Sequence, residues 1–264
     1  MDLQLNGKTA LVTGSTAGIG LAIAAALAAE GASVVVNGRT EARVEQATRA
    51  IRSATPGANV RGIARDLATA QGCEQLVKAL SAVDILVNNL GIFEPKPFAE
   101  IPDSDWLRMF EANVLSGVRM SRQYLPKMLA AGWGRIIFIS SESAVNIPAE
   151  MIHYGMTKTA QISVARGLAE MTKGTAVTVN SVLPGPTRSE GVEGFLQQMA
   201  AAKKTDLAQV EKDFFAKIRP TSLLQRFQTP EEIAQVVAFV ASPRAAAING
   251  AAVRAEGGVV QAAL

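Results

Sequence analysis

The sequence predicts an α/β fold in which helices cover both faces of a doubly wound parallel sheet. Two observations predict it. Short apolar runs alternate with amphipathic helical segments along the chain, a pattern typical of βαβ units. A glycine-rich turn, residues 14–20, joins the first apolar run to the first helical segment. With 264 residues, 48% of them hydrophobic and 19% charged, the chain can bury a sizeable core without disulfides.

Each element is predicted from its own residue pattern. Short apolar runs, several of them rich in valine, predict strands, and these runs are residues 9–12, 32–36, 60–64, 83–87, 135–139, 176–182 and 252–255. Longer segments with apolar residues on one face predict helices, and these segments are residues 21–29, 41–53, 71–80, 106–130, 153–173 and 230–241. The last helix has Pro230 at its start, where the missing N–H costs no hydrogen bond.

We treat residues 1–264 as a single cofactor-binding and catalytic domain with one small helical insertion. The segment from about 190 to 228 interrupts the alternation, and its helical pattern over residues 190–217 is polar and irregular. An insertion of this kind is typical of a mobile lid over a binding site. Its large apolar side chains form either the underside of the lid or the core of the insertion: Phe195, Met199, Phe214 and Phe215.

Composition narrows the classes of function. The 26 basic and 23 acidic residues are interspersed and give a net charge of +3, so no basic stripe indicates a nucleic-acid partner. Cys73 and His153 are the only cysteine and histidine, so we expect no disulfide and no metal site. The first residues lack a signal-peptide pattern, and the longest apolar run, residues 21–29, is too short to span a bilayer. We therefore expect a cytoplasmic protein without membrane segments.

The glycine-rich turn predicts a dinucleotide-binding site. Gly14 permits a sharp turn, and Gly18 and Gly20 let the backbone approach a pyrophosphate. Free N–H groups and the helix dipole favour an anion at the start of the following helix. We expect this turn to contact the cofactor through Gly14, Ser15, Thr16, Gly18, Ile19 and Gly20.

Tyr154 and Lys158 predict a site of proton transfer. They lie four positions apart on a predicted helix, so they share one face of it. A lysine ammonium near a phenol favours the phenolate, so we expect a lowered pKa for Tyr154 and a role as acid or base. His153 is adjacent to Tyr154 and does not face it, so we expect His153 at the surface or at an interface.

These motifs together resemble those of the short-chain dehydrogenase/reductase family. The spacing Thr-Gly-x-x-x-Gly-x-Gly at residues 13–20 resembles the glycine motif of the family, and the other motifs follow in its order. The resemblance covers residues 9–189, extends to Gly257 and Gly258, and implies a single-domain, Rossmann-like fold. The motifs that carry it are Asn-Asn-x-Gly at 88–91, Asn113, Ser141, Tyr-x-x-x-Lys at 154–158 and Pro-Gly at 184–185.

The residues after the second predicted strand favour NADP over NAD. An acidic residue there would bind the 2′-hydroxyl of NAD, but residues 36–40 contain none. Arg39 can donate several hydrogen bonds in one plane to a 2′-phosphate, and Gly38 leaves room for it. The resemblance implies the same preference, because family members with a basic residue at this place use NADP. NAD is the alternative cofactor.

The resemblance assigns roles to the remaining residues. It implies that Ser141, rather than the neighbouring Ser140, bonds the substrate oxygen. It also implies that Asn113 bends its helix and holds a water linked to Lys158. The implied cofactor contacts are Asp66 and Leu67, Asn89 and Gly91, Tyr154 and Lys158, Pro184 and Gly185, and either Thr187 or Ser189 at the carboxamide.

These expectations describe an NADP(H)-dependent oxidoreductase, a ketoreductase that reversibly reduces a ketone or aldehyde to an alcohol. Its catalytic residues would be Asn113, Ser141, Tyr154 and Lys158. The alternatives are an NAD-dependent alcohol dehydrogenase, a 3-oxoacyl-(acyl-carrier-protein) reductase and a non-catalytic nucleotide-binding regulator. The resemblance also implies a homotetramer and a small-molecule carbonyl or alcohol substrate, whose identity the sequence does not specify.

Overall fold

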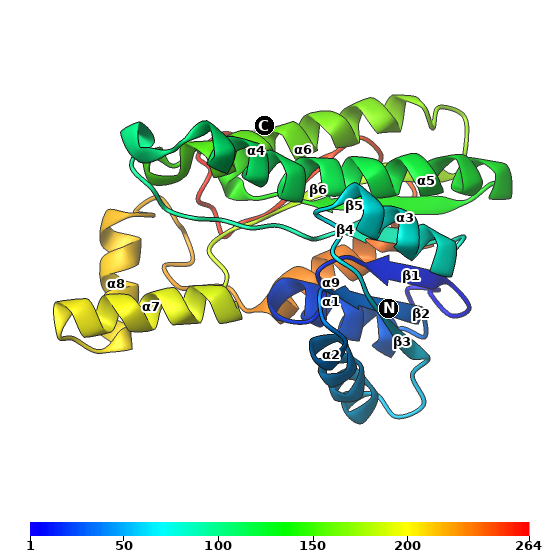
Figure 1. Cartoon of the computed structure of the whole chain (residues 1–264), viewed down its shortest axis with the longest axis horizontal. Coiled ribbons are helices and arrows are strands. Elements are labelled where there is room, and N and C mark those ends of the chain that lie inside the picture. The colour runs from blue at the N-terminus through cyan, green and yellow to red at the C-terminus, as the bar shows by residue number, and fades with distance from the viewer. Residues whose placement is uncertain (264) are drawn as a thin grey trace.

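The fold is built on one seven-stranded sheet in which every pair of neighbouring strands is parallel (Figure 1). The computed structural model describes residues 1–263 and, within this range, every side chain except those of Phe195 and Lys203. The order β3-β2-β1-β4-β5-β6-β7 reverses between β1 and β4, so the predicted doubly wound, Rossmann-like sheet is confirmed. The strands are β1 Thr9–Val12, β2 Ser33–Gly38, β3 Val60–Ala64, β4 Ile85–Asn88, β5 Gly134–Ile139, β6 Val177–Pro184 and β7 Ala252–Ala255.

Helices cover both faces of this sheet (Figure 1). Helices α1, α2 and α9 pack on one face, and α3, α5 and α6 pack on the other. Their bounds are α1 Gly18–Ala29, α2 Glu41–Ala54, α3 Ala70–Ala79, α4 Asp103–Phe110, α5 Ser116–Ala131, α6 Ile152–Glu170, α7 Glu190–Lys203, α8 Leu207–Lys217 and α9 Pro230–Ala241. No helix within residues 1–263 has the length and hydropathy needed to cross a membrane.

Alternating side chains of the central strands pack into the apolar clusters on the two faces of the sheet. Successive residues of a strand point to opposite faces, so Ile137 of β5 packs against α1 and α9 while Phe138 packs against α5. Strands buried on both faces need apolar residues at nearly every position. This explains why the strands read as continuous apolar runs rather than as alternating patterns.

The predicted helix over residues 106–130 is interrupted in the structure. It consists of α4, one turn of π-helix at Glu111–Leu115, and α5. Within this turn the N–H of Ser116 bonds the carbonyl of Glu111, five residues back rather than four. Such turns often occur at functional sites, and this one contains Asn113.

The predicted helical segment over residues 190–217 is two helices, α7 and α8. Helix α7 ends at Lys204, whose φ of 50° lies in the left-handed region. Helix α8 begins after Asp206, whose carboxylate accepts a hydrogen bond from the N–H of Gln209 at 2.8 Å. The two helices share their own apolar cluster, which is made of Leu196, Ala200, Val210, Phe215 and Phe227.

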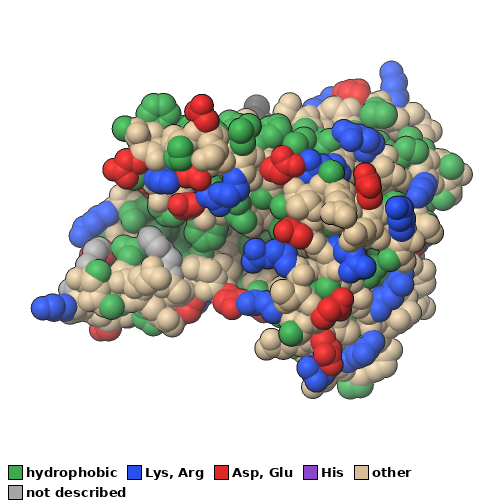
Figure 2. Space-filling model, viewed as in Figure 1, with side chains coloured by type: hydrophobic (Ala, Val, Ile, Leu, Met, Phe, Trp, Pro, Cys, Tyr) green, Lys and Arg blue, Asp and Glu red, His purple; other side chains and the backbone are tan. Residues whose placement is uncertain are grey.

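Helices α7 and α8 project beyond the carboxyl ends of the strands (Figure 1). Figure 2 shows a hollow between them and the rest of the molecule, with hydrophobic side chains visible inside it. The insertion therefore borders the edge of the sheet at which ligands of doubly wound folds bind.

The capping box at the start of α9 gives a direct test of local stability. Thr229 accepts a hydrogen bond from the N–H of Glu232 at 3.3 Å, and the Glu232 carboxylate accepts one from the N–H of Thr229 at 2.8 Å. We expect Thr229→Ala to lower the free energy of unfolding by about 1 kcal/mol. Thr40 precedes α2 without a capping side-chain bond, so Thr40→Ala should lower the free energy of unfolding clearly less. Equal losses in chemical denaturation would contradict this account of α9.

Candidate active site

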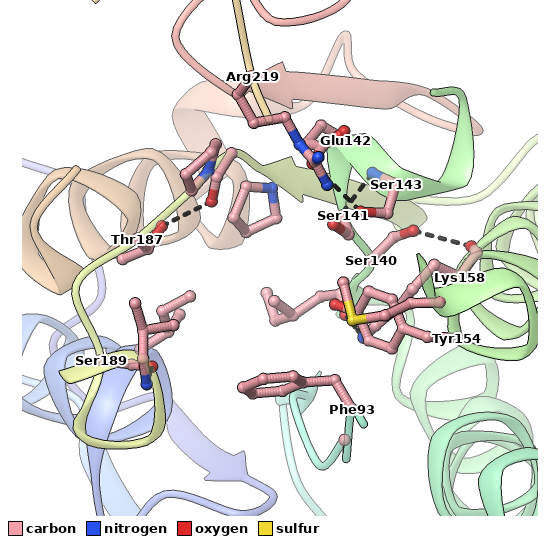
Figure 3. Close-up of a pocket in the computed structure, with 18 of the residues that line it drawn as sticks. Phe93, Ser140, Ser141, Glu142, Ser143, Tyr154, Lys158, Thr187, Ser189 and Arg219 are labelled. Carbon is pink, nitrogen blue, oxygen red and sulfur yellow. Dashed lines mark hydrogen bonds and ion pairs between the residues drawn. The ribbon is translucent and has the colours of Figure 1, made fainter. Parts of the chain in front are cut away.

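A cleft of about 310 Å³ opens at the carboxyl edge of the sheet. Its walls come from the ends of β4, β5 and β6, from α6, and from the insertion (Figure 3). Many of the predicted site residues line it, namely Ile19, Asn89, Gly91, Ser141, Tyr154, Lys158, Pro184, Gly185, Thr187 and Ser189. Residues that the sequence places far apart are therefore brought together here.

The glycine turn has the geometry that a pyrophosphate site requires. Gly14 and Gly18 adopt φ values of 60° and 54°, in the left-handed region that favours glycine. A Cβ on Gly20 would lie 2.4 Å from Nδ2 of Asn89 and 2.6 Å from the carbonyl oxygen of Gly14. Ala17, the residue before α1, supplies no capping side chain. The first N–H groups of α1 are therefore available to an anion, and the turn fits a dinucleotide.

Ser15 and Thr16 take part in packing the turn against its neighbours. The Ser15 hydroxyl donates to the carbonyl of Val12 at 2.7 Å and accepts from the N–H of Asn37 at 3.0 Å. A Cβ on Gly38 would lie 2.4 Å from the Thr16 methyl group. A side chain at position 38 would therefore collide with Thr16, which accounts for the glycine there, and the expectation that Gly38 leaves room for a 2′-phosphate stays a prediction.

The other residues predicted to meet the adenosine end lie along the same edge of the sheet. Arg39 is exposed directly after β2. Asp66 is exposed after β3, and its carboxylate accepts a hydrogen bond from the N–H of Ala68 at 3.0 Å. Leu67 is buried in the core, so only its backbone is available at the edge.

Asn89 holds the glycine turn in place. Its Nδ2 donates to the carbonyl oxygens of Thr13 at 2.9 Å and Gly14 at 3.0 Å. A Cβ on the nearby Gly91 would lie 3.4 Å from Nζ of Lys158 and 3.6 Å from Oδ1 of Asn113. Gly91 thus lies in close contact with the predicted catalytic residues, and a side chain there would pack directly against them.

Ser141 and Tyr154 meet on one wall of the cleft (Figure 3). Ser141 directly follows β5, and its hydroxyl accepts a hydrogen bond from the N–H of Ser143 at 3.1 Å. Its hydrogen bond with Tyr154 acts to lower the pKa of that phenol. Ser140 instead donates its hydroxyl to the Lys158 carbonyl at 2.8 Å. The structure therefore brings Ser141, rather than Ser140, to the tyrosine.

Burial dominates the acid–base properties of Tyr154 and Lys158. It raises the pKa of Tyr154 to about 12 and lowers the pKa of Lys158 to about 7. The expected lowering of the Tyr154 pKa by Lys158 is therefore wrong for this arrangement. The Lys158 ammonium lies 5.5 Å from the centroid of the Tyr154 ring and donates to the carbonyl of Ile139 at 2.8 Å and to Oε1 of Gln161 at 3.2 Å.

Asn113 is fully buried in the π-helical turn, which lies between α4 and α5. Its Oδ1 accepts from the N–H of Ile92 at 2.7 Å, and its Nδ2 donates to the Ile92 carbonyl at 2.9 Å and to Oγ1 of Thr157 at 3.0 Å. Gln161 links Asn113 and Lys158 directly, because its Nε2 donates to the Asn113 carbonyl at 2.6 Å while its Oε1 accepts from Lys158. The water that the resemblance implies at this place stays a prediction.

Sequence reasoning missed Gln161, although a signal was present. It lies three positions after Lys158 on the same helix, so the two side chains share a face. A polar residue on the buried face of a helix needs hydrogen-bond partners, and this requirement points to the site.

The placement expected for His153 is also wrong. The side chain is fully buried, and its ring packs edge-to-face on Trp106 with centroids 5.8 Å apart. Neither ring nitrogen has a hydrogen-bond partner among the described residues. Burial lowers the pKa of His153, so the ring is neutral and belongs to the packing between α4 and α6.

Thr187 and Ser189 both line the cleft after β6. The Thr187 hydroxyl donates to the Gly185 carbonyl at 2.9 Å. The Ser189 hydroxyl caps α7 by accepting from the N–H of Val192 at 3.4 Å. A Cβ on Gly18 would lie 3.2 Å from the Ser189 Cβ, so Ser189 is next to the glycine turn.

The apolar residues of the insertion divide between its core and the cleft. Phe214 lines the cleft and also packs on Phe227, with ring centroids 4.9 Å apart. Phe215 is buried inside the insertion, and Met199 packs against the same cluster. The prediction for Phe195 lies outside the described side chains. The large apolar side chains of the insertion therefore do both of the things expected of them, because some face the cleft and others form the core of the insertion.

An ion pair joins the insertion to the floor of the cleft. Nε of Arg219, which follows α8, lies 2.9 Å from Oε1 of Glu142, the residue after Ser141 (Figure 3). Their side chains are 9% and 4% exposed. Burial raises the pKa of Glu142, and Arg219 opposes this shift. The pair fixes the position of the insertion relative to Ser141.

Comparisons with known proteins agree with this architecture. A family model described as short chain dehydrogenase matches residues 8–200. The chain is 51% identical over 261 residues to a Bacillus subtilis protein named uncharacterized oxidoreductase YvaG, with 99% of each chain covered. It is 31% identical over 263 residues to the 3-oxoacyl-[acyl-carrier-protein] reductase FabG of Aquifex aeolicus, covering 98% of this chain and 100% of that protein.

Solved structures show the same similarity. The L-sorbose reductase of Gluconobacter frateurii, crystallised with NADPH and L-sorbose, matches with a TM-score of 0.92 at 31% identity. The match covers 99% of this chain and 100% of that one.

The ion pair between Arg219 and Glu142 predicts a pH-dependent loss of stability. In Arg219→Met the opposing cation is gone, so the pKa of Glu142 rises further above its unfolded value. A carboxyl with a raised folded-state pKa loses its stabilising contribution as the pH rises through that pKa. We expect the free energy of unfolding to fall by about 3–5 kcal/mol at pH 8 and by less at pH 5. Glu142→Gln in the same background should restore most of it; equal losses at both pH values in urea denaturation would contradict the assignment.

Proposed function

The chain belongs to the short-chain dehydrogenase/reductase family of oxidoreductases, and within it we propose an NADP(H)-dependent reductase of ketones or aldehydes. The reaction is the reversible reduction of the carbonyl to an alcohol. The observation that carries the proposal is the convergence of Ser141, Tyr154 and Lys158 on a cleft that also reaches Ile19, in the glycine turn. Hydride transfer from a dinucleotide requires acid–base residues at one end of the cleft and a phosphate-binding site at the other.

The residues of the cleft divide the chemistry between them. The bound cofactor supplies the hydride. Ser141 donates a hydrogen bond to the substrate oxygen and holds it beside Tyr154. Tyr154, with its pKa raised to about 12, is fully protonated at neutral pH and donates the proton to that oxygen during reduction. The apolar walls exclude water, which strengthens these polar contacts.

The reverse reaction, oxidation of the alcohol, needs Tyr154 in its deprotonated form. Tyr154 must then accept a proton from the alcohol, which a phenol with a high pKa does only at alkaline pH or beside a cation. Lys158 provides that cation while it remains charged, and its lowered pKa of about 7 limits the range over which it does so. Near neutral pH the site therefore holds Tyr154 in the protonated form that reduction uses.

Arg39 supports NADP as the cofactor. It is exposed at the end of β2, next to the turn in which Thr16 packs on Gly38. No acidic residue stands in 36–40 to pair with a free 2′-hydroxyl. A guanidinium at this edge would pair with a 2′-phosphate. The remaining predicted contacts, from Asp66 to Ser189, would hold the rest of the dinucleotide along the strand ends.

The insertion and the assembly complete the proposal. Residues 190–228 act as a lid over the substrate, because Phe214 and Arg219 both line the cleft. The solved relative named L-sorbose reductase and the relative named 3-oxoacyl-[acyl-carrier-protein] reductase act on different carbonyl compounds by name, so substrate choice is expected to depend on this lid. We retain the homotetramer as the proposed assembly.

Replacing Tyr154 tests the proposed proton donor. Tyr154→Phe keeps the ring and removes the hydroxyl, so we expect kcat to fall by about 10²- to 10⁴-fold with the affinity for NADPH unchanged. Turnover is measured with NADPH and a carbonyl panel that includes L-sorbose and a β-keto ester. The matched control is Tyr124→Phe, which removes the only other tyrosine hydroxyl, bonded to the Leu80 carbonyl. Near-normal turnover in Tyr154→Phe would rule out the role.

Replacing Arg39 tests the cofactor. A charge-assisted contact with the 2′-phosphate contributes about 1.5–3 kcal/mol, so Arg39→Ala should weaken NADPH binding about 10- to 100-fold and leave NADH binding unchanged. Reduced-nicotinamide fluorescence measures both. Arg43→Ala is the control, because Arg43 is on the same segment but pairs with Glu190. Tighter binding of NADH than of NADPH by the wild type would instead favour the NAD-dependent dehydrogenase.

A further inference from the structure

Lys158 lies in a space with few polar partners. Its side chain is buried, with 4% of the residue exposed. Its ammonium donates to the Ile139 carbonyl at 2.8 Å and to Oε1 of Gln161 at 3.2 Å. A buried ammonium depends on such acceptors, because it has lost its hydration. Gln161 therefore supplies one of the contacts that hold Lys158 in place.

The other end of the Gln161 side chain is fixed by the π-helical turn. Hydrogen bonds in this turn skip one residue further than in an α-helix, as the bond from Ser116 N–H to the Glu111 carbonyl shows. The Asn113 carbonyl accepts instead from Nε2 of Gln161 at 2.6 Å. Gln161 is 1% exposed, so its carboxamide is held at both ends inside the protein.

The orientation of this carboxamide follows from its partners. The Asn113 carbonyl only accepts hydrogen bonds, and the Lys158 ammonium only donates them. The opposite orientation would place oxygen against oxygen and NH₂ against the ammonium. The bridge therefore has one direction, with its NH₂ on Asn113 and its oxygen on Lys158.

We infer that Gln161 is a positioning residue that ties the Lys158 ammonium to the backbone of the π-helical turn at Asn113. The inference rests on the proposed function for its catalytic consequence. A carboxamide neither releases nor takes up a proton at ordinary pH, so Gln161 holds Lys158 and does not carry protons to it. By accepting from the ammonium, it favours the charged form of Lys158 beside Tyr154.

The groups that face the ammonium define the expected pH dependence. They are the Ile139 carbonyl from β5, and the Gln161 carboxamide and the Tyr154 ring from α6; of these, Tyr154 alone titrates. Glu142 and Arg219 act on the pKa of Tyr154 and are unchanged by a substitution at Gln161. Loss of the carboxamide therefore acts on the charged form of Lys158.

Gln161→Met keeps the length of the side chain and removes both hydrogen bonds. The pKa of Lys158 should fall further, by about one unit for a lost hydrogen bond to a charged group. Because that bond is strongest while Lys158 is charged, the substitution should destabilise the protein more at pH 5.5 than at pH 8. The expected difference is about tenfold in the unfolding equilibrium constant, measured by urea denaturation without cofactor or substrate.

The control is Asn180→Leu. Asn180 is also a buried carboxamide that bridges backbone groups, donating to the Ile248 carbonyl at 2.8 Å and accepting from the N–H of Ala251 at 3.0 Å. It is bonded to no ionisable group in these contacts, so its loss should destabilise the protein equally at both pH values. If Gln161→Met also lowered the free energy of unfolding by the same amount at both pH values, the inference would be overturned.

Kinetics separates a positioning role from a structural one. Gln161→Met should lower kcat about tenfold, leave KM for the carbonyl nearly unchanged, and move the falling limb of alcohol oxidation, where Lys158 loses its charge, to lower pH by about one unit. An unshifted limb, or the same shift in Asn180→Leu, would overturn the inference. If the wild type reduces no carbonyl compound, the proposed function fails, and the pH-dependent denaturation still decides the role of Gln161.

Discussion

The site depends on the burial of the Lys158 ammonium at the end of β5. A cation without water must be surrounded by acceptors, and here these are the Ile139 carbonyl and the Gln161 carboxamide. The contact with Ile139 ties α6 to the end of β5, and Gln161, through its bond to the Asn113 carbonyl, ties α6 to the π-helical turn. The same packing leaves Tyr154 beside Ser141, whose position is set by the strand it follows. The geometry of the proposed proton-transfer residues is thus a consequence of how one buried charge is accommodated.

The two ends of the cleft are coupled through short polar contacts rather than through a separate domain. Asn89 ties the end of β4 to the glycine turn after β1, and Asn113 ties the following loop, at Ile92, to α6 through Thr157. The reversal of strand order between β1 and β4 creates the gap into which both ends open. In the proposed function, a dinucleotide held at the turn would reach the proposed acid–base residues across neighbouring strand ends, and the insertion would cover the substrate side.

The sequence predicted the strands and most helices because strands buried on both faces and amphipathic helices leave strong local patterns. It also predicted the residues that meet in the cleft, because short motifs carried them. It failed where the outcome depends on contacts between distant segments. His153, expected at the surface or at an interface, is buried against Trp106. The lowered pKa of Tyr154 was expected from spacing alone, whereas burial, which a local pattern does not reveal, determines the direction of its shift.

The pKa of Lys158 tests the central claim most directly. It can be followed from the side-chain ¹⁵N resonance in protein labelled with ¹⁵N-lysine, with Lys158→Met to assign the signal. The account predicts titration near the value of about 7 that burial gives, well below the pKa of about 10.4 of a lysine in a model peptide. A Lys158 signal that titrates near the model-peptide value would show that water reaches the ammonium, and would contradict the claim that its burial organises the site.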